Sequence, residues 1–224
     1  MKILSIDTST KYFVLSICDE SKMYELNLEV EKRLSSLINI TIQRALNYVG
    51  IRLDDLDYFA CGLGPGSFTG LRIGVAAIKG FCLSLKKPVI GISSLDILAK
   101  NASHLEEKNI IPIIDAKRGL IYSSVYKIKD NRLLRLKQYT LETFDELLKN
   151  KIKNPVFLGD AVDLYKHKII SSIRGAVVLD KDYWFPKGHH IAELALKKIR
   201  SKKISNPFTI KPIYLYPKEC QIRK

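Results

Sequence analysis

The order of apolar and polar residues in the first part of the chain predicts strands and helices in alternation. Ile3–Ile6 and Phe13–Cys18 are apolar runs typical of buried strands, and Met23–Val30 alternates as a strand with one wet face does. Apolar residues then recur at helical spacing from 33 to 50, where Gly50 ends the predicted helix. Further elements are predicted at 56–60 (strand), 69–85 (helix), 89–92 (strand) and from Ser94 (helix). The order β-β-β-α-β-α-β-α indicates the α/β class.

The second half begins with a similar pattern, which indicates an internal duplication. Residues 111–125 repeat the strand, aspartate, short turn and strand of the N-terminus, so that Asp115 matches Asp7. A third strand is predicted at 133–139, a helix at 144–148, a strand at 156–158, a helix at 191–199 and an irregular end at 207–224. We therefore expect two α/β lobes, residues 1–102 and residues 103–224.

Composition fits a cytoplasmic protein with its own core. A chain of 224 residues is long enough for one large or two small domains without disulfides or metals. The four cysteines, Cys18, Cys61, Cys82 and Cys220, are scattered and form no Cys-x-x-Cys pair, which favours reduced thiols. No stretch reads as a membrane span or a signal peptide, so we expect no membrane contact and a cytoplasmic location.

The positive charge is concentrated in the second half. Residues 1–100 hold 12 Lys+Arg against 10 Asp+Glu, a net +2, so the remaining residues supply +12 of the total +14. The densest run is Lys197, Lys198, Arg200, Lys202 and Lys203, at the end of the last predicted helix. Cations at that end of a helix offset its macrodipole, which explains the run without a ligand. The alternative is that the run holds phosphates of a nucleic acid.

The segment Gly62–Gly74 is the most specific pattern in the chain, because glycines and hydroxyls crowd a predicted strand-to-helix junction. A P-loop would need a lysine directly after Gly70, and neither the dinucleotide-binding pattern nor a nucleophilic serine elbow fits the spacing. The remaining interpretation is a helix start capped by Ser67 or Thr69. The glycines that share one helical face, and so allow another backbone to pack closely, are Gly66, Gly70 and Gly74.

Five segments in chain order carry a family resemblance. They are Ile6–Thr10, Gly64–Gly74, Gly91–Leu95, Asp115–Arg118 with Tyr122, and Pro212–Leu215. Together they resemble the TsaB (YeaZ) family, a glycoprotease-like branch of the actin-like ATPase superfamily. The resemblance implies a two-lobed actin-like (ribonuclease-H-like) fold with ββαβαβα-type lobes and mixed sheets. The chain departs from the family pattern at Arg33–Ser35, where His-Ser is common, and at Tyr216, where arginine is common.

The same resemblance implies partners. TsaB works beside a catalytic homologue, TsaD, and an ATPase, TsaE, in forming N6-threonylcarbamoyladenosine in tRNA. The resemblance therefore implies a non-catalytic activating subunit with a TsaD-like partner, a TsaE-like partner and tRNA in one complex. When the chain is alone, a homodimer is implied instead.

The residues themselves offer no complete catalytic site. The related catalytic subunit holds its metal through a His-x-x-x-His pair, and the four histidines here, His104, His167, His189 and His190, form no such pair. We therefore expect no catalytic residue, no metal and no required cofactor. The alternative is a self-standing ATPase or kinase of the actin-like fold, which bound ATP and turnover by the purified chain would reveal.

The loop after the first strand separates these two hypotheses. In the actin-like fold this loop contacts nucleotide phosphates, and the residues that would do so here are Asp7, Thr8, Ser9, Gly64, Gly66 and Ser67. The alternative, which we favour, is a local turn in which the side chain of Asp7 accepts hydrogen bonds from backbone amides. ATP or ADP would then bind weakly at most, and only within the complex.

The first two long helices offer a surface for a partner. The interface residues predicted on them are Leu34, Leu37, Ile38, Thr41, Ala45, Gly70, Ile73, Gly74 and Ala77. The hypothesis is that the helices at 33–49 and 69–85 bind the TsaD-like homologue or a second copy of the chain. A Gly74→Leu variant would then fold but associate poorly.

Overall fold

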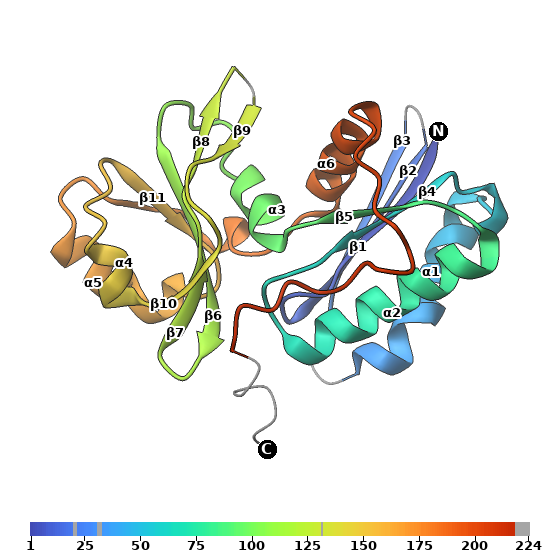
Figure 1. Cartoon of the computed structure of the whole chain (residues 1–224), viewed down its shortest axis with the longest axis horizontal. Coiled ribbons are helices and arrows are strands. Elements are labelled where there is room, and N and C mark those ends of the chain that lie inside the picture. The colour runs from blue at the N-terminus through green and yellow to red at the C-terminus, as the bar shows by residue number, and fades with distance from the viewer. Residues whose placement is uncertain (20–21, 31–32, 131, 218–224) are drawn as a thin grey trace. The chain divides into compact units, whose positions relative to one another are not determined.

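The computed structural model describes residues 1–19, 22–30, 33–130 and 132–217, and the chain divides into two compact units (Figure 1). Unit 1 comprises residues 1–97 and 186–213, and unit 2 comprises residues 98–185 and 214–224. The expected division at residue 102 is corrected by this arrangement, because residues 186–213 return to the first unit instead of completing a C-terminal lobe.

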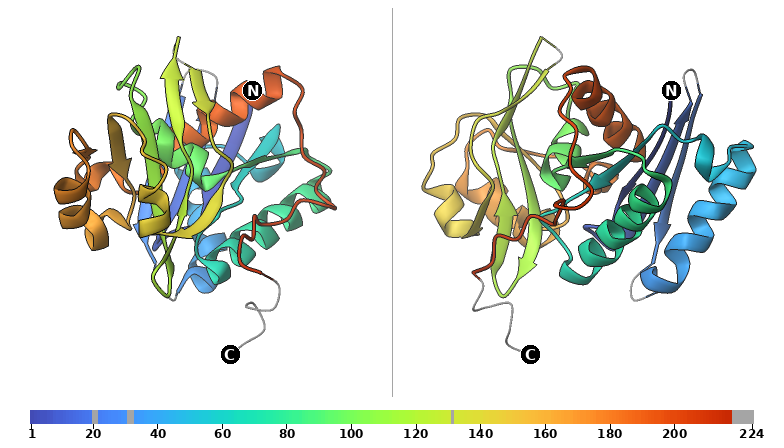
Figure 2. Two further views of the ribbon diagram at one scale, coloured as in Figure 1. Left: turned by 60° about the vertical axis from the view of Figure 1, so that its left-hand side comes forward. Right: turned by 45° about the vertical axis from the view of Figure 1, so that its right-hand side comes forward.

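Unit 1 is built on a mixed sheet of five strands in the order β3-β2-β1-β4-β5. Its elements are β1 (Lys2–Asp7), β2 (Tyr12–Asp19), β3 (Lys22–Glu29), α1 (Leu34–Val49), the 3-10 turn η1 (Leu53–Asp55), β4 (Tyr58–Gly62), α2 (Phe68–Leu85), β5 (Val89–Ile92), α3 (Ser94–Lys100, which runs into unit 2) and α6 (Gly188–Arg200). β1 pairs antiparallel with β2 and parallel with β4. Helices α1 and α2 cover one face of the sheet and α6 covers the other (Figure 2).

Alternation along β1 explains why both faces of this sheet are covered. Leu4 and Ile6 belong to the core beneath α1 and α2, whereas Ile3 packs with Ile191 and Ala195 of α6 on the opposite face. All five side chains are fully buried. Side chains of a strand point to alternate faces, so a strand that is apolar at consecutive positions needs a cover on each side. The late helix α6 supplies the second cover.

The segment after α6 also belongs to unit 1. Ser205 bridges to Val89 of β5, and the Ile213 amide donates to the Leu63 carbonyl at 2.8 Å. Between them Ile210 is buried in the core beneath α1 and α2. The irregular conformation expected after residue 207 is confirmed for the described residues up to 217.

Helix α2 corrects the expectation that no stretch is apolar enough for a membrane span. With 18 residues and a mean hydropathy of 1.4, the helix is long and apolar enough to cross a membrane, by length and composition alone. In the structure, the side of α2 that bears Leu71, Val75, Ile78 and Cys82 is buried within unit 1. Its apolar composition is therefore accounted for by packing against the sheet.

Unit 2 repeats the strand order of unit 1, which confirms the duplication. Its elements are β6 (Asn109–Lys117), β7 (Leu120–Ser123), β8 (Tyr126–Lys129), β9 (Arg132–Arg135), β10 (Thr140–Thr143), α4 (Phe144–Leu148), β11 (Pro155–Leu158), α5 (Val162–Ser172), β12 (Val177–Val178) and the 3-10 turn η2 (Lys181–Tyr183). The path β10-β7-β6-β11-β12 matches β3-β2-β1-β4-β5 strand for strand, with β8 and β9 added beside β6. The two-lobed mixed α/β class is confirmed.

Two expectations for unit 2 are wrong in detail. The strand expected at 133–139 ends at Arg135 as β9, residues 136–139 are not strand, and neither β8 nor β10 was predicted. Helix α5 was also missed, because only Val162 and Ile169 on it are buried, too few apolar positions for a clear helical period.

Candidate functional site

The loop between β1 and β2 forms a closed turn rather than an open phosphate loop. Asp7 is fully buried, and its Oδ1 accepts hydrogen bonds from the Ser9 amide at 2.8 Å and the Ser9 hydroxyl at 2.6 Å. This Asx-type turn confirms the local interpretation of the Asp7–Ser9 sequence. Thr8 and Ser9 are exposed by only 1% and 2%, so the turn offers almost no surface to a nucleotide.

A second serine ties the turn to the glycine-rich segment. The Ser94 hydroxyl donates to Asp7 Oδ2 at 2.6 Å and accepts from the Gly64 amide at 3.0 Å. Burial raises the pKa of Asp7 above its ordinary value, and the hydrogen bonds from Ser9 and Ser94 offset part of that rise. The carboxyl of Asp7 is thus a structural acceptor that joins the ends of β1, β4 and β5.

The glycine-rich segment fills the space in front of the turn. The Ser67 hydroxyl caps α2 by accepting from the Gly70 amide at 3.2 Å, which identifies Ser67 rather than Thr69 as the cap. A Cβ on Gly66 would overlap the Ser9 carbonyl oxygen, one on Gly70 the Thr8 carbonyl oxygen, and one on Gly74 the Thr8 hydroxyl. These glycines are therefore needed for packing inside unit 1.

The candidate phosphate-loop residues are thus brought together but turned inward. Asp7, Thr8, Ser9 and Gly64 are buried, while Gly66 is partly exposed and Ser67 is exposed. The carbonyl oxygens of Thr8 and Ser9 lie against Gly70 and Gly66, so the glycine-rich segment covers this side of the turn.

The structure corrects five of the predicted interface residues. Leu34, Ile38, Ala45, Gly70 and Gly74 are all buried within unit 1, so they cannot contact a partner while the unit is folded. Leu37, Thr41, Ile73 and Ala77 are partly exposed and remain candidates. The periodic pattern identified the apolar stripe of α1 correctly, but that stripe is the side that packs on the sheet.

Other apolar side chains on α1 and α2 face solvent and were missed. Tyr48 is 78% exposed and packs its ring 5.4 Å from that of Tyr24, while Ile40 and Leu83 are each 42% exposed. Phe68 lies at the start of α2 with the Arg72 guanidinium 3.8 Å above its ring. The signal available in the sequence was an apolar residue on the polar side of an amphipathic helix.

The basic run at the end of α6 is only partly free to bind phosphate. Lys198 turns inward, where its Nζ donates to the Gly91 carbonyl at 2.6 Å. Lys197, Arg200, Lys202 and Lys203 are exposed. The predicted set of five tRNA contacts is therefore reduced to four.

The start of α6 is held by a carboxylate from β3. Glu25 accepts from the Gly188 amide at 2.6 Å, from the His189 amide at 3.3 Å and from His189 Nδ1 at 2.8 Å. Burial alone would raise the pKa of Glu25, but these hydrogen bonds outweigh burial and hold the pKa below its usual value. The carboxylate thereby fixes α6 on the sheet of unit 1.

A Glu25→Gln substitution should lower the free energy of unfolding by about 1–2 kcal/mol at neutral pH, because it removes a charged acceptor at a helix N-terminus. Folding lowers the pKa of Glu25, so its carboxylate stabilises the folded protein at pH values above the ordinary glutamate pKa. This stabilisation is lost as the pH falls through the pKa that Glu25 has in the folded protein. Urea unfolding at neutral and acid pH checks both points. Glu29→Gln, which breaks an exposed ion pair with Lys11, is the control and should cost less than about 1 kcal/mol. Equal losses would contradict the assignment.

The hydrogen bonds of Asp115 in unit 2 differ from those of the buried Asp7 in unit 1. Asp115, its counterpart, accepts from the Lys117 ammonium at 2.5 Å, and its own amide donates to Asp160 at 2.9 Å. Burial raises the pKa of Asp160 to about 6.

Tyr216, which stands where the family commonly has arginine, donates its hydroxyl to the Ala116 carbonyl at 2.8 Å. Within the described residues, no three His, Cys, Asp or Glu side chains gather as a metal site would require.

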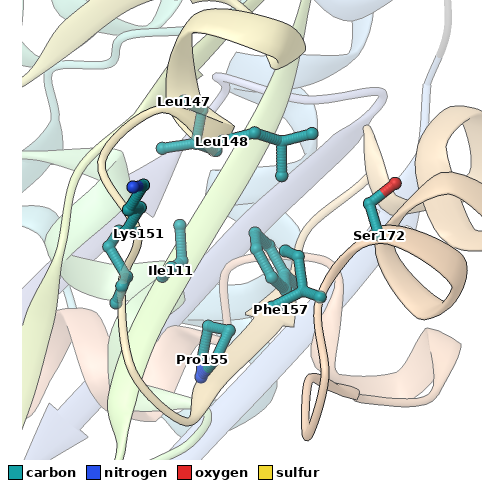
Figure 3. A pocket seen from close by; sticks show the side chains of 9 residues that line it. Ile111, Leu147, Leu148, Lys151, Pro155, Phe157 and Ser172 are labelled. Carbon is teal, nitrogen blue, oxygen red and sulfur yellow. The ribbon is translucent and has the colours of Figure 1, made fainter.

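Unit 2 also contains an apolar pocket of about 170 Å³ between α4, β11 and the end of α5 (Figure 3). Ile111, Leu147, Leu148, Pro155 and Phe157 form most of its wall. Lys151 and Ser172 are the lining residues with polar side-chain groups, and they lie on opposite sides of the pocket (Figure 3).

Comparison with known proteins places these features in context. Residues 28–211 match a family model described as TsaD: tRNA N6-adenosine threonylcarbamoyltransferase. The tRNA threonylcarbamoyladenosine biosynthesis protein TsaB of Buchnera aphidicola subsp. Schizaphis graminum is 36% identical over 154 residues, covering 68% of this chain and 71% of that protein. TsaB of Bacillus subtilis is 34% identical over 173 residues, covering 75% of each. The structure of YeaZ from Pseudomonas aeruginosa has a TM-score of 0.83 at 20% identity, covering 96% of this chain and 99% of that one, and shares the fold.

Proposed function

The chain belongs to the TsaB family of tRNA threonylcarbamoyladenosine biosynthesis proteins, and we propose that it acts there as a non-catalytic subunit that activates a TsaD-like transferase. The observation that carries the proposal is the closed β1–β2 turn. Both carboxylate oxygens of Asp7 accept hydrogen bonds, Oδ1 from Ser9 and Oδ2 from Ser94. The start of α2 occupies the space in front of the turn. A phosphate-binding ATPase of this fold would need that loop open. We therefore propose that no cofactor is required and that ATP or ADP binds only weakly, within the complex.

The proposed partner surface is the exposed side of α1 and α2. On α1, Leu37, Ile40, Thr41 and Tyr48 follow one another at helical spacing, and none of them is buried. On α2, Ile73, Ala77 and Gly80 form a matching line of mostly small residues. Small residues allow a helix of another protein to approach closely. This surface would bind the TsaD-like subunit in the complex and a second copy of the chain when it is alone.

The remaining partners follow from the same proposal. A TsaE-like ATPase supplies nucleotide chemistry to the complex, and the exposed cations Lys197, Arg200, Lys202 and Lys203 contact tRNA phosphates. Three buried thiols, those of Cys18, Cys61 and Cys82, fit a cytoplasmic location. Cys220 lies outside the described residues.

A Gly80→Leu substitution tests the partner surface without disturbing the fold. A Cβ on Gly80 would meet nothing within 4 Å, so unit 1 should keep its stability to within about 1 kcal/mol. The bulky side chain would hold a partner helix away, and affinity for the TsaD-like protein should fall at least about tenfold. Titration calorimetry measures the affinity, and Leu164→Arg on exposed α5 is the matched control. A Gly80→Leu protein with undiminished affinity would place the interface elsewhere.

A further inference from the structure

The β8–β9 hairpin gives unit 2 an open strand edge. β8 pairs with β6 on one side and with β9 on the other. Within the described residues β9 pairs only with β8, so it forms the edge of this part of the sheet (Figure 1). An edge strand exposes a row of backbone donors and acceptors to which another chain can pair.

The register shows which groups of β9 face outward. The Ile128 carbonyl of β8 accepts from the Glu107 amide at 3.3 Å, so it points away from β9. In an antiparallel pair of strands, two kinds of opposite residues alternate. In one kind the amides and carbonyls bond to each other, and in the other kind they point away from the partner strand. Leu133 lies opposite Ile128, and so its amide and carbonyl point to the open edge, as do those of Arg135 two residues on. In the described part of the chain these groups have no backbone partner on that side.

The side chains along this edge are apolar and basic. Leu134 is 42% exposed and Leu136 is 56% exposed. Lys129 and Arg132 lie opposite each other at the tip of the hairpin and are exposed, and the Arg135 guanidinium lies 4.2 Å above the ring of Tyr139. Cations on an edge strand often prevent another strand from pairing with it. Exposed leucines beside those cations do not prevent such pairing.

We propose that the open edge of β9 binds an extended acidic segment of a partner protein, which adds to the sheet as a further strand. Its backbone would pair with Leu133 and Arg135, its apolar side chains would cover Leu134 on one face of the sheet, and its carboxylates would lie near Arg135 on the other face. A second copy of this edge is a poor occupant, because the cations would repel each other. A nucleic acid would use the cations but neither the strand edge nor the leucines.

A labelled synthetic peptide in which valine and glutamate alternate tests the inference on the full chain by fluorescence anisotropy. We expect binding that weakens as salt is added. The double variant Leu134→Asp, Leu136→Asp should bind at least about tenfold more weakly, because it removes the apolar contacts and adds repulsion. Leu164→Asp, an exposed leucine of α5 in the same unit, is the matched control and should bind as the unchanged chain does. Circular dichroism establishes that each variant is folded.

A second peptide with proline at its central position separates strand pairing from simple charge attraction, since proline cannot donate to the ladder. We expect the proline peptide to bind at least about tenfold more weakly. Equal binding of the two peptides, or no binding of either, would overturn the inference. So would a result in which unmodified tRNA binds, the peptide does not, and Arg132→Ala with Lys129→Ala abolishes the tRNA binding. None of these outcomes bears on α1 and α2, so the test is independent of the proposed partner surface.

Discussion

Gly74→Leu should destabilise unit 1 by about 3 kcal/mol or more, at the upper end of the cost of overpacking. A Cβ on Gly74 would overlap the Thr8 hydroxyl, and the Cγ2 of Thr8 lies 3.1 Å from that Cβ position. Thr8 cannot move aside easily, because the turn around it is fixed by the two bonds from Ser9 to Asp7. This expectation replaces the hypothesis from sequence that the variant would fold and only lose association. Urea unfolding followed by circular dichroism measures the change.

Gly80→Leu on the same helix is the matched control for that measurement. Both variants add the same side chain to α2, but only Gly74 is packed against another segment. Gly74→Leu should therefore unfold at a much lower urea concentration than Gly80→Leu. If the two unfold together, Gly74 is not packed against the β1–β2 turn as described.

Asp7→Ala should lower the free energy of unfolding by about 3–5 kcal/mol. It removes three hydrogen bonds and leaves the Ser9 amide and the Ser94 hydroxyl without their acceptor inside the protein. A buried polar group left unsatisfied costs about 1–3 kcal/mol. Burial raises the pKa of Asp7 in spite of those bonds, so removing the buried carboxyl offsets part of this cost.

Asp57→Ala is the matched control for Asp7→Ala. Asp57 accepts one exposed hydrogen bond from the Lys2 amide at 2.7 Å, so its loss should cost less than about 1 kcal/mol. If Asp7→Ala is as stable as Asp57→Ala, the carboxyl of Asp7 is not structural. A site prepared for a ligand, whose residues are often strained or poorly satisfied, would be the better interpretation.

Local patterns were sufficient to predict most of unit 1. α1 and α2 have strong helical periods and clear ends, such as Gly50 after α1 and Ser67 before α2. The strand β5 was predicted at its observed bounds because Val89–Ile92 is a short apolar run between a proline and a serine pair. In each case the information lies within the element itself.

Contacts between distant segments could not be predicted in this way. The period of α6 shows that one side is apolar, but not that Ile191 and Ala195 meet Ile3 of β1. The spacing of Gly70 and Gly74 shows that something packs closely there, but not that the neighbour is Thr8. The inward turn of Lys198 depends on the nearby Gly91 carbonyl, which no pattern near α6 reveals.

Five residues of the candidate partner surface were predicted wrongly for a related reason. Helical periodicity identifies apolar residues that must be buried against something. Leu34, Ile38 and Ala45 are buried against the sheet of their own unit. Residues left for a partner are those that stay exposed after folding, such as Tyr48 and Ile40. Exposure after folding is a property of the tertiary structure, so a sequence pattern alone assigns it poorly.

The central claim is that this chain activates a transferase without doing chemistry itself. The most direct test is the rate of threonylcarbamoyladenosine formation in tRNA by reconstituted TsaD-like and TsaE-like proteins, with and without this chain. We expect no product from the chain alone, little from the other two proteins, and full activity when all three are present. The folded Gly80→Leu variant should fail to restore that activity at concentrations where the unchanged chain does. Product formation by the chain with tRNA and substrates alone, or steady ATP turnover on the order of 1 per second by the chain free of partners, would contradict the account.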